Sequence, residues 1–67
     1  MNLNPLKGRR FIKGKTQWQL SHETGIAQSR ISLIENNLSQ PSKKEMVLLS
    51  EALGYSPEEI WSPSEGN

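Results

Sequence analysis

Cysteine is absent from this 67-residue sequence, histidine occurs once, and long apolar runs are missing. Without cysteine the chain can form neither a disulfide bond nor a thiolate metal site, and this composition suits a reducing cytoplasm. The longest apolar run is residues 46–49, so we expect neither a membrane-spanning helix nor a signal peptide. The single histidine, His22, has no second histidine or cysteine with which to share a metal ion. We therefore predict a soluble, cytoplasmic protein that holds no metal ion and no cofactor.

The length predicts a single domain, residues 1–67. We expect its ordered core at about residues 4–61 and a disordered C-terminal tail at residues 62–67. A domain of this size buries only about 60% of the surface of its extended chain, so the core is small and the margin of stability modest. The absence of any effector domain fits either a complete small regulator or a domain of a longer chain.

The sequence contains residue types found in catalytic and phosphate-binding sites, but their spacing does not allow them to form such a site. Gly8 and Gly14 do not form a phosphate-binding loop. Ser21, His22 and Glu23 are the residue types of a catalytic triad, but successive residues on a helix point about 100° apart and cannot converge. We therefore predict that the protein is not an enzyme.

Acidic residues are scarce in the first two thirds of the chain. Residues 1–44 contain all eight Lys and Arg and only two acids, a balance of +6, whereas residues 45–67 contain five acids and no Lys or Arg, a balance of −5. This polarity is expected if the first half faces a polyanion and the second half faces away from it or toward a partner. A solvated surface on which the charges have separated by chance explains it equally well.

Helix start and stop signals recur along the chain, and neither a strand pattern nor an internal repeat is present. The first predicted helix spans about Pro5 to Lys13, with Asn4 as its N-cap, and the third spans about Gln28 to Glu35. The second begins at Thr16 and ends at Gly25, the fourth begins at Ser42 and ends at Gly54, and the last begins at Ser56 and ends near Trp61. Capping boxes are predicted at Thr16 with Gln19 and at Ser42 with Glu45. Gly25 and Asn37 are expected in the left-handed conformation that ends a helix. The predicted fold class is an all-α bundle.

The helix at about residues 28–35 has an unusual outer face. Its apolar side carries Ala27, Ile31 and Ile34, and the helical period places a polar, nearly uncharged set on the opposite side, namely Gln28, Ser29, Ser32, Leu33 and Asn36. Lys and Glu would be the ordinary choice for solubility, whereas Gln and Ser supply donors and acceptors that can read DNA base edges. Arg30, on a flank, suits a phosphate or a guanine.

Several short motifs occur together at characteristic spacing. They are Thr16-Gln17 with Leu20, Gly25-Ile26, the run QSRISLIEN at residues 28–36, Pro41-Ser42 and Ala52-Leu53-Gly54. On these residues the chain resembles the Cro/repressor-type (xenobiotic-response-element) family of helix-turn-helix DNA-binding regulators over about Leu6 to Ile60. The resemblance implies a five-helix, lambda-repressor-like domain in which helices 2 and 3 form the helix-turn-helix.

The resemblance also implies roles for individual residues. The second helix of the motif would lie in the major groove of double-stranded DNA, and the base readers would be Gln28, Ser29, Ser32 and Leu33. Phosphate contacts would come from Gln17, Arg30, Asn36, Lys43 and Lys44. Gln17 would also brace the amide of Gln28. Arg10 and Glu35 match a largely buried ion pair with an architectural role.

Four positions depart from the family pattern. Lys15 and Lys43 stand where an apolar residue is usual, which predicts a thinner core at both places. Ser21 replaces the usual alanine, and Ala27 replaces the usual capping Ser or Thr.

Family resemblance further implies a homodimer on DNA. The candidate contacts are Leu48, Tyr55 and Trp61, with Ile60 assigned to the core; in the alternative, Tyr55 and Trp61 complete the core and Leu48 is an ordinary exposed residue. Trp18 could lie on the DNA backbone or a partner, but packing on the first helix is favoured. The competing function is a protein-interaction module, such as the antitoxin half of a toxin-antitoxin pair, for which an exposed Leu48 and Trp61 would be the evidence.

Overall fold

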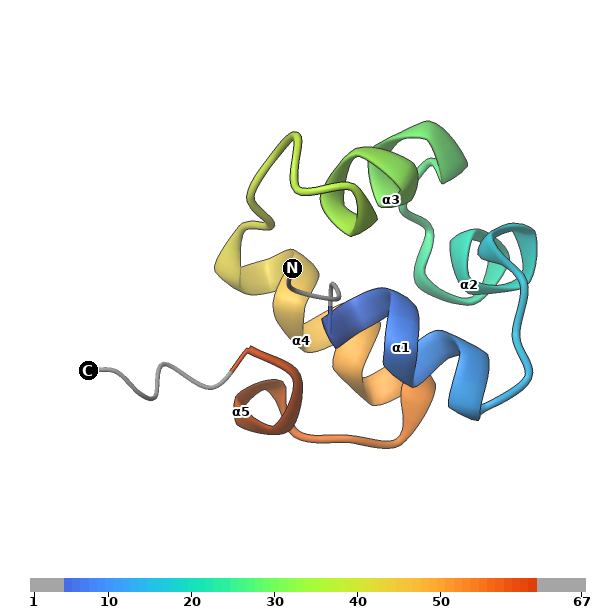
Figure 1. The fold of residues 1–67 in the computed structure, drawn as a ribbon, viewed down its shortest axis with the longest axis vertical. Helices are drawn as coiled ribbons and strands as arrows, with labels where there is room; N and C mark the ends of the chain where they lie inside the picture. Colours follow the sequence, from blue (N-terminus) through green and yellow to red (C-terminus); the bar gives the residue numbers. More distant parts are fainter. Residues whose placement is uncertain (1–4, 62–67) are drawn as a thin grey trace.

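The computed structural model describes residues 5–61 and contains five helices in that range (Figure 1). They are α1 (Pro5–Ile12), α2 (Gln17–Thr24), α3 (Gln28–Glu35), α4 (Lys43–Leu53) and α5 (Pro57–Ile60). No strand occurs in the described part of the chain, so the all-α prediction is confirmed. The predicted cap at Asn4 and the predicted tail at residues 62–67 lie outside the described residues.

Reciprocal capping bonds begin two of the helices. At α2, the Thr16 hydroxyl accepts from the Gln19 amide at 3.0 Å, and the Gln19 side chain accepts from the Thr16 amide at 2.8 Å. At α4, Ser42 and Glu45 form the same pair of bonds, at 3.1 and 2.8 Å. Both predicted capping boxes are confirmed, and each satisfies amide groups that the first turn of a helix leaves unpaired.

The turn between α2 and α3 is short and hydrogen-bonded. Gly25 ends α2 at φ 81°, a left-handed conformation that glycine adopts without a steric cost, and its amide donates to the Ser21 carbonyl at 2.8 Å. The hydroxyl of Ser21, in place of the usual alanine, donates to the Ile26 carbonyl at 2.6 Å. Ala27 supplies no side-chain cap to α3. The turn is therefore held by the end of α2 rather than by a cap on α3.

The small core lies where α2, α3 and α4 meet, with α1 and α5 closing it. Its buried apolar members are Leu6, Leu20, Ile26, Ile31, Ile34, Leu49, Leu53 and Ile60. Ile60 is 3% exposed, as predicted. Leu48 was expected on the outer side of α4, but it is half-buried against the core because α4 packs against both α2 and α5. The exposed apolar residue of α4 is instead Val47.

Two further expectations differ from the structure at the start of α2. Trp18 does not pack on α1: it is 63% exposed and stacks on His22, with 5.5 Å between ring centroids and 7° between ring planes. Lys15 does not leave a gap in the core, because its amine reaches the Ala52 carbonyl at 2.9 Å and the Glu23 carboxylate at 2.6 Å. Within residues 5–61, no helix has the length and apolar character needed to cross a membrane.

Candidate nucleic-acid interface

One side of α3 faces the core and the other faces solvent. Ile31 and Ile34 anchor the helix inside the protein, at 0% and 2% exposure. In Figure 1, α3 lies at the top edge of the molecule. The face of α3 opposite Ile31 and Ile34 carries the predicted base readers. Of these, Gln28 and Ser29 are exposed, and neither side chain has a hydrogen-bond partner among residues 5–61. Their donors and acceptors are therefore available to a ligand.

The rest of this face is more constrained. Leu33 is 42% exposed, whereas Ser32 is half-buried. The Asn36 side-chain amide donates to the Ser32 carbonyl at 2.9 Å and to its hydroxyl at 3.3 Å. Ser32 and Asn36 therefore satisfy part of each other's hydrogen-bonding capacity. Gln28 and Ser29 form no such bond with each other.

A buried ion pair fixes α3 to α1. Arg10 donates to both Glu35 oxygens, from Nε at 2.6 Å and from Nη2 at 3.1 Å, and their side chains are 8% and 1% exposed. Nη1 of Arg10 donates to the Lys15 carbonyl at 2.8 Å. Gln17 of α2 adds a third donor to Glu35, from Nε2 at 2.9 Å. Gln17 is thus directed to Glu35 and not, as expected, to the Gln28 amide, and its second amide N–H has no partner among residues 5–61.

Arg30 is held by the protein itself. Its guanidinium donates to both Glu45 oxygens at 2.9 and 2.8 Å, to the Gln40 carbonyl at 2.9 Å and to the Ser39 hydroxyl. The bond from Arg30, with a further bond from the Ser42 amide, lowers the pKa of Glu45 from 4.5 to about 2. The same contact raises the pKa of Arg30 above its ordinary value. Arg30, which was expected at a phosphate or a guanine, joins α3 to the loop that follows and to α4.

Two unpaired cations lie at the start of α4. Lys43 and Lys44 are both exposed, and neither forms an ion pair or hydrogen bond with a side chain in the described part of the chain. Their charges are therefore not neutralised by any side chain among residues 5–61.

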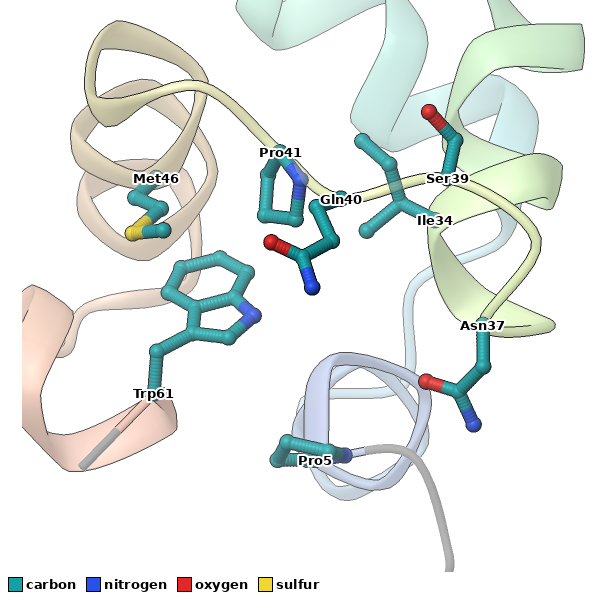
Figure 2. Close-up of a pocket in the computed structure, with 8 residues that line it drawn as sticks. All are labelled: Pro5, Ile34, Asn37, Ser39, Gln40, Pro41, Met46 and Trp61. Atoms are coloured by element: carbon teal, nitrogen blue, oxygen red, sulfur yellow. The ribbon is translucent and has the colours of Figure 1, made fainter. Parts of the chain in front are cut away.

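A hollow of about 360 Å³ lies below the loop that joins α3 to α4 (Figure 2). Its lining residues are Pro5, Ile34, Asn37, Ser39, Gln40, Pro41, Met46 and Trp61. Figure 2 shows the side chains of Trp61 and Gln40 pointing toward each other across it. No ionisable side chain is in this lining, and no group of three His, Asp or Glu residues gathers anywhere in residues 5–61. The lining therefore combines uncharged polar side chains with apolar ones.

Comparison with protein families identifies this arrangement. The family model described as Helix-turn-helix matches residues 8–60. The chain belongs to the Cro/C1-type helix-turn-helix family. Comparison with curated proteins and with solved structures finds no match.

The family match confirms the predicted fold and identifies α2 and α3 as the helix-turn-helix. In this helix-turn-helix domain, α2 and α3 are the two helices of the motif, and Gly25, Ile26 and Ala27 form the turn between them. The family is a DNA-binding one, so the chain is a DNA-binding domain of the type found in transcription regulators.

The helix-turn-helix domain also places the three residues that were expected at a dimer contact. Leu48, Tyr55 and Trp61 are all half-buried and packed against the core. The Tyr55 ring contacts two cations of α1 and the residue after it, with the Arg9 guanidinium 4.8 Å and the Lys13 amine 5.1 Å from its centroid. Only the exposed edges of these side chains are therefore free to contact a second copy.

Proposed function

We propose that this protein is a small cytoplasmic transcriptional repressor that reads a specific double-stranded DNA site with α3 in the major groove. The observation that carries the proposal is the exposed, uncharged polar end of α3, where Gln28 and Ser29 have no side-chain hydrogen-bond partner among the described residues. A Gln amide suits the N6 and N7 atoms of adenine, and a Ser hydroxyl can donate or accept. The anchored opposite side of α3 would hold these groups in register with the groove.

Phosphate contacts would flank the reading helix on both sides. Lys43 and Lys44 carry free charges at the start of α4, Gln17 retains one amide N–H, and Asn36 lies at the exposed C-terminus of α3. The acidic residues of the second half of the chain begin at Glu45, whose charge is already paired with Arg30. Binding should therefore weaken as salt rises, with a slope set by the few phosphates contacted.

On DNA, two copies would bind as a homodimer with their reading helices about 34 Å apart. The contact would use the exposed edges of Leu48, Tyr55 and Trp61. Because these side chains are half-buried within each copy, the interface they can form is small, and we expect dimerisation to depend on DNA. Sedimentation of the free protein and of its complex over a concentration series tests this arrangement.

Two substitutions test the DNA-reading assignment. Gln28→Ala should reduce discrimination at one base position by about 1–3 kcal/mol and leave the affinity for unrelated duplexes unchanged. Lys44→Ala should weaken binding to all duplexes alike and reduce the salt slope by about 1. Lys7→Ala is the charge-matched control, because Lys7 is an exposed cation of α1, for which no DNA or dimer contact is proposed. Equal effects of Lys44→Ala and Lys7→Ala would contradict the proposed docking.

A protein-interaction module, such as an antitoxin, is the second candidate. The exposed Leu48 and Trp61 that would have supported it are half-buried, but Phe11, Ile12 and Trp18 are 62%, 68% and 63% exposed. Such side chains could bind a protein partner. If Trp18→Ala and Ile12→Ala left sequence-specific DNA binding intact and abolished binding to a purified partner, both functions would reside in one chain on separate surfaces.

A further inference from the structure

Two leucines interrupt the polar face that surrounds the reading helix. Leu33 is 42% exposed and Leu38 is 72% exposed. Neither side chain can form a hydrogen bond, so neither can help to read a donor or an acceptor. Exposed leucines that occur singly need no explanation, but these two are close together and next to the proposed base readers.

The end of α3 brings the two leucines together. Asn37 adopts a left-handed conformation at φ 60°, the Leu38 amide donates to the Leu33 carbonyl at 2.9 Å, and the Asn37 amide donates to the Ile34 carbonyl at 3.2 Å. This pair of bonds defines a Schellman motif. In such motifs, the two residues at the positions equivalent to Leu33 and Leu38 commonly make an apolar contact. Both leucines are therefore part of one fixed structure at the C-terminal end of the reading helix.

The helical period relates Leu33 to the bases. Leu33 follows Ser29 by four residues, and side chains at this spacing are neighbours on one helix face, about 5–6 Å apart. Base pairs of DNA are stacked at about 3.4 Å. If Ser29 lies at a base edge, Leu33 then lies over a base pair one or two steps away.

The major groove presents one apolar group at that depth, the C5-methyl group of thymine. We propose that Leu33 packs against a thymine methyl group one or two base pairs from the base read by Ser29, with Leu38 covering the same contact from the loop. The inference rests on the proposed function and extends it, because it states what kind of base the apolar part of the surface selects. The occupant is the methyl group and not a protein partner, because the leucines adjoin the free donors and acceptors of Gln28 and Ser29 on one face.

The test removes only the methyl group. After selection of a binding site from random duplexes, each thymine is replaced in turn by deoxyuridine and the dissociation constant is measured with the unaltered protein. We expect one position at which affinity falls about fourfold, as for one methyl-sized group returned to water, and little change at the others. In a duplex with cytosine at that position, replacing the cytosine by 5-methylcytosine should raise the affinity by the same factor.

Variants assign the effect to a residue. Leu33→Ala should bind the thymine and deoxyuridine sites equally, whereas Val47→Ala, which shortens an exposed apolar residue on α4, should keep the fourfold difference. Thermal unfolding of both variants checks that they remain folded. Specific binding with no deoxyuridine effect, or an effect that survives Leu33→Ala, overturns the thymine assignment alone. Failure to select any site overturns the proposed function as well.

Discussion

Breaking the ion pair between Arg10 and Glu35 should remove most of the stability of this protein. The pair is almost sealed from solvent, with side-chain exposures of 8% and 1%, and Arg10 holds both oxygens of Glu35. Leaving one charge of a buried pair without its partner costs about 3–5 kcal/mol. At about 0.05–0.15 kcal/mol per residue, a chain of this length has a total stability of about 3–10 kcal/mol. Arg10→Met or Glu35→Leu alone should therefore leave the protein barely folded at 25 °C.

The two substitutions together should largely cancel. In the double variant no buried charge is left unpaired, and two apolar side chains of similar volume take up the space. What remains is the loss of a partner for the Lys15 carbonyl and the Gln17 amide, each about 1 kcal/mol, and Gln17 is half-exposed and can bind water instead. We expect the double variant within about 2 kcal/mol of the parent protein.

Urea unfolding followed by circular dichroism measures all four members of this cycle. The single variants should add to a loss of about 6–10 kcal/mol, so the coupling energy should be at least about 4 kcal/mol. Discrimination between base sequences by the folded double variant should match that of the parent protein, because in the proposed docking the pair positions α3 without contacting bases. Single variants that lose less than about 1 kcal/mol each would refute the reasoning, because the desolvated pair would then be contributing no more than a surface one.

Three further predictions concern single features. Because the pKa of Glu45 falls from 4.5 to about 2 on folding, its contribution to stability should be complete above about pH 4.5 and disappear as the pH drops toward 2. Glu45→Gln should therefore flatten that part of the curve of unfolding free energy against pH, and unchanged curvature would contradict the assignment. Gly25→Ala should lower the free energy of unfolding by about 1–2 kcal/mol because φ is 81°, although nothing lies within 4 Å of the added Cβ. Gly8→Ala, inside α1, should instead raise the free energy of unfolding by about 0.5–1 kcal/mol. Thermal unfolding compares the two variants. Trp18→Ala should change the unfolding free energy by less than about 0.5 kcal/mol, since the indole touches little besides His22, and a larger loss in urea unfolding would show that it packs more tightly than its exposure indicates.

Local chemistry made the helices predictable. The bounds of α3 agree with the prediction because an apolar stripe, a preceding glycine and the left-handed Asn37 all mark the same segment. The capping boxes at Thr16 and Ser42 are likewise complete within four residues. The ends of two helices differ by one residue from the prediction: α1 ends at Ile12 rather than Lys13, and α5 ends at Ile60 rather than near Trp61. Each of these signals depends on residues that are near in sequence, and such residues meet whatever the rest of the chain does.

Contacts between segments that are distant in sequence were harder to predict. Nothing in the spacing of Arg30 and Glu45 indicates that a loop will bring them together, so Arg30 was assigned to DNA. Trp18 is a different case, because its orientation could have been derived. Leu20 is buried, and two residues along a helix rotate a side chain by about 200°, which places Trp18 on the outer side of α2.

The four hydrogen bonds of Arg30 have a consequence for the thermodynamics of association. They join the loop residues Ser39 and Gln40 to α3 and to Glu45 of α4. Ordering a free residue costs about 1–2 kcal/mol of conformational entropy, and here that cost has been met during folding. Docking through this loop should then resemble the meeting of rigid bodies, and the loop should add no folding contribution to the heat-capacity change of binding.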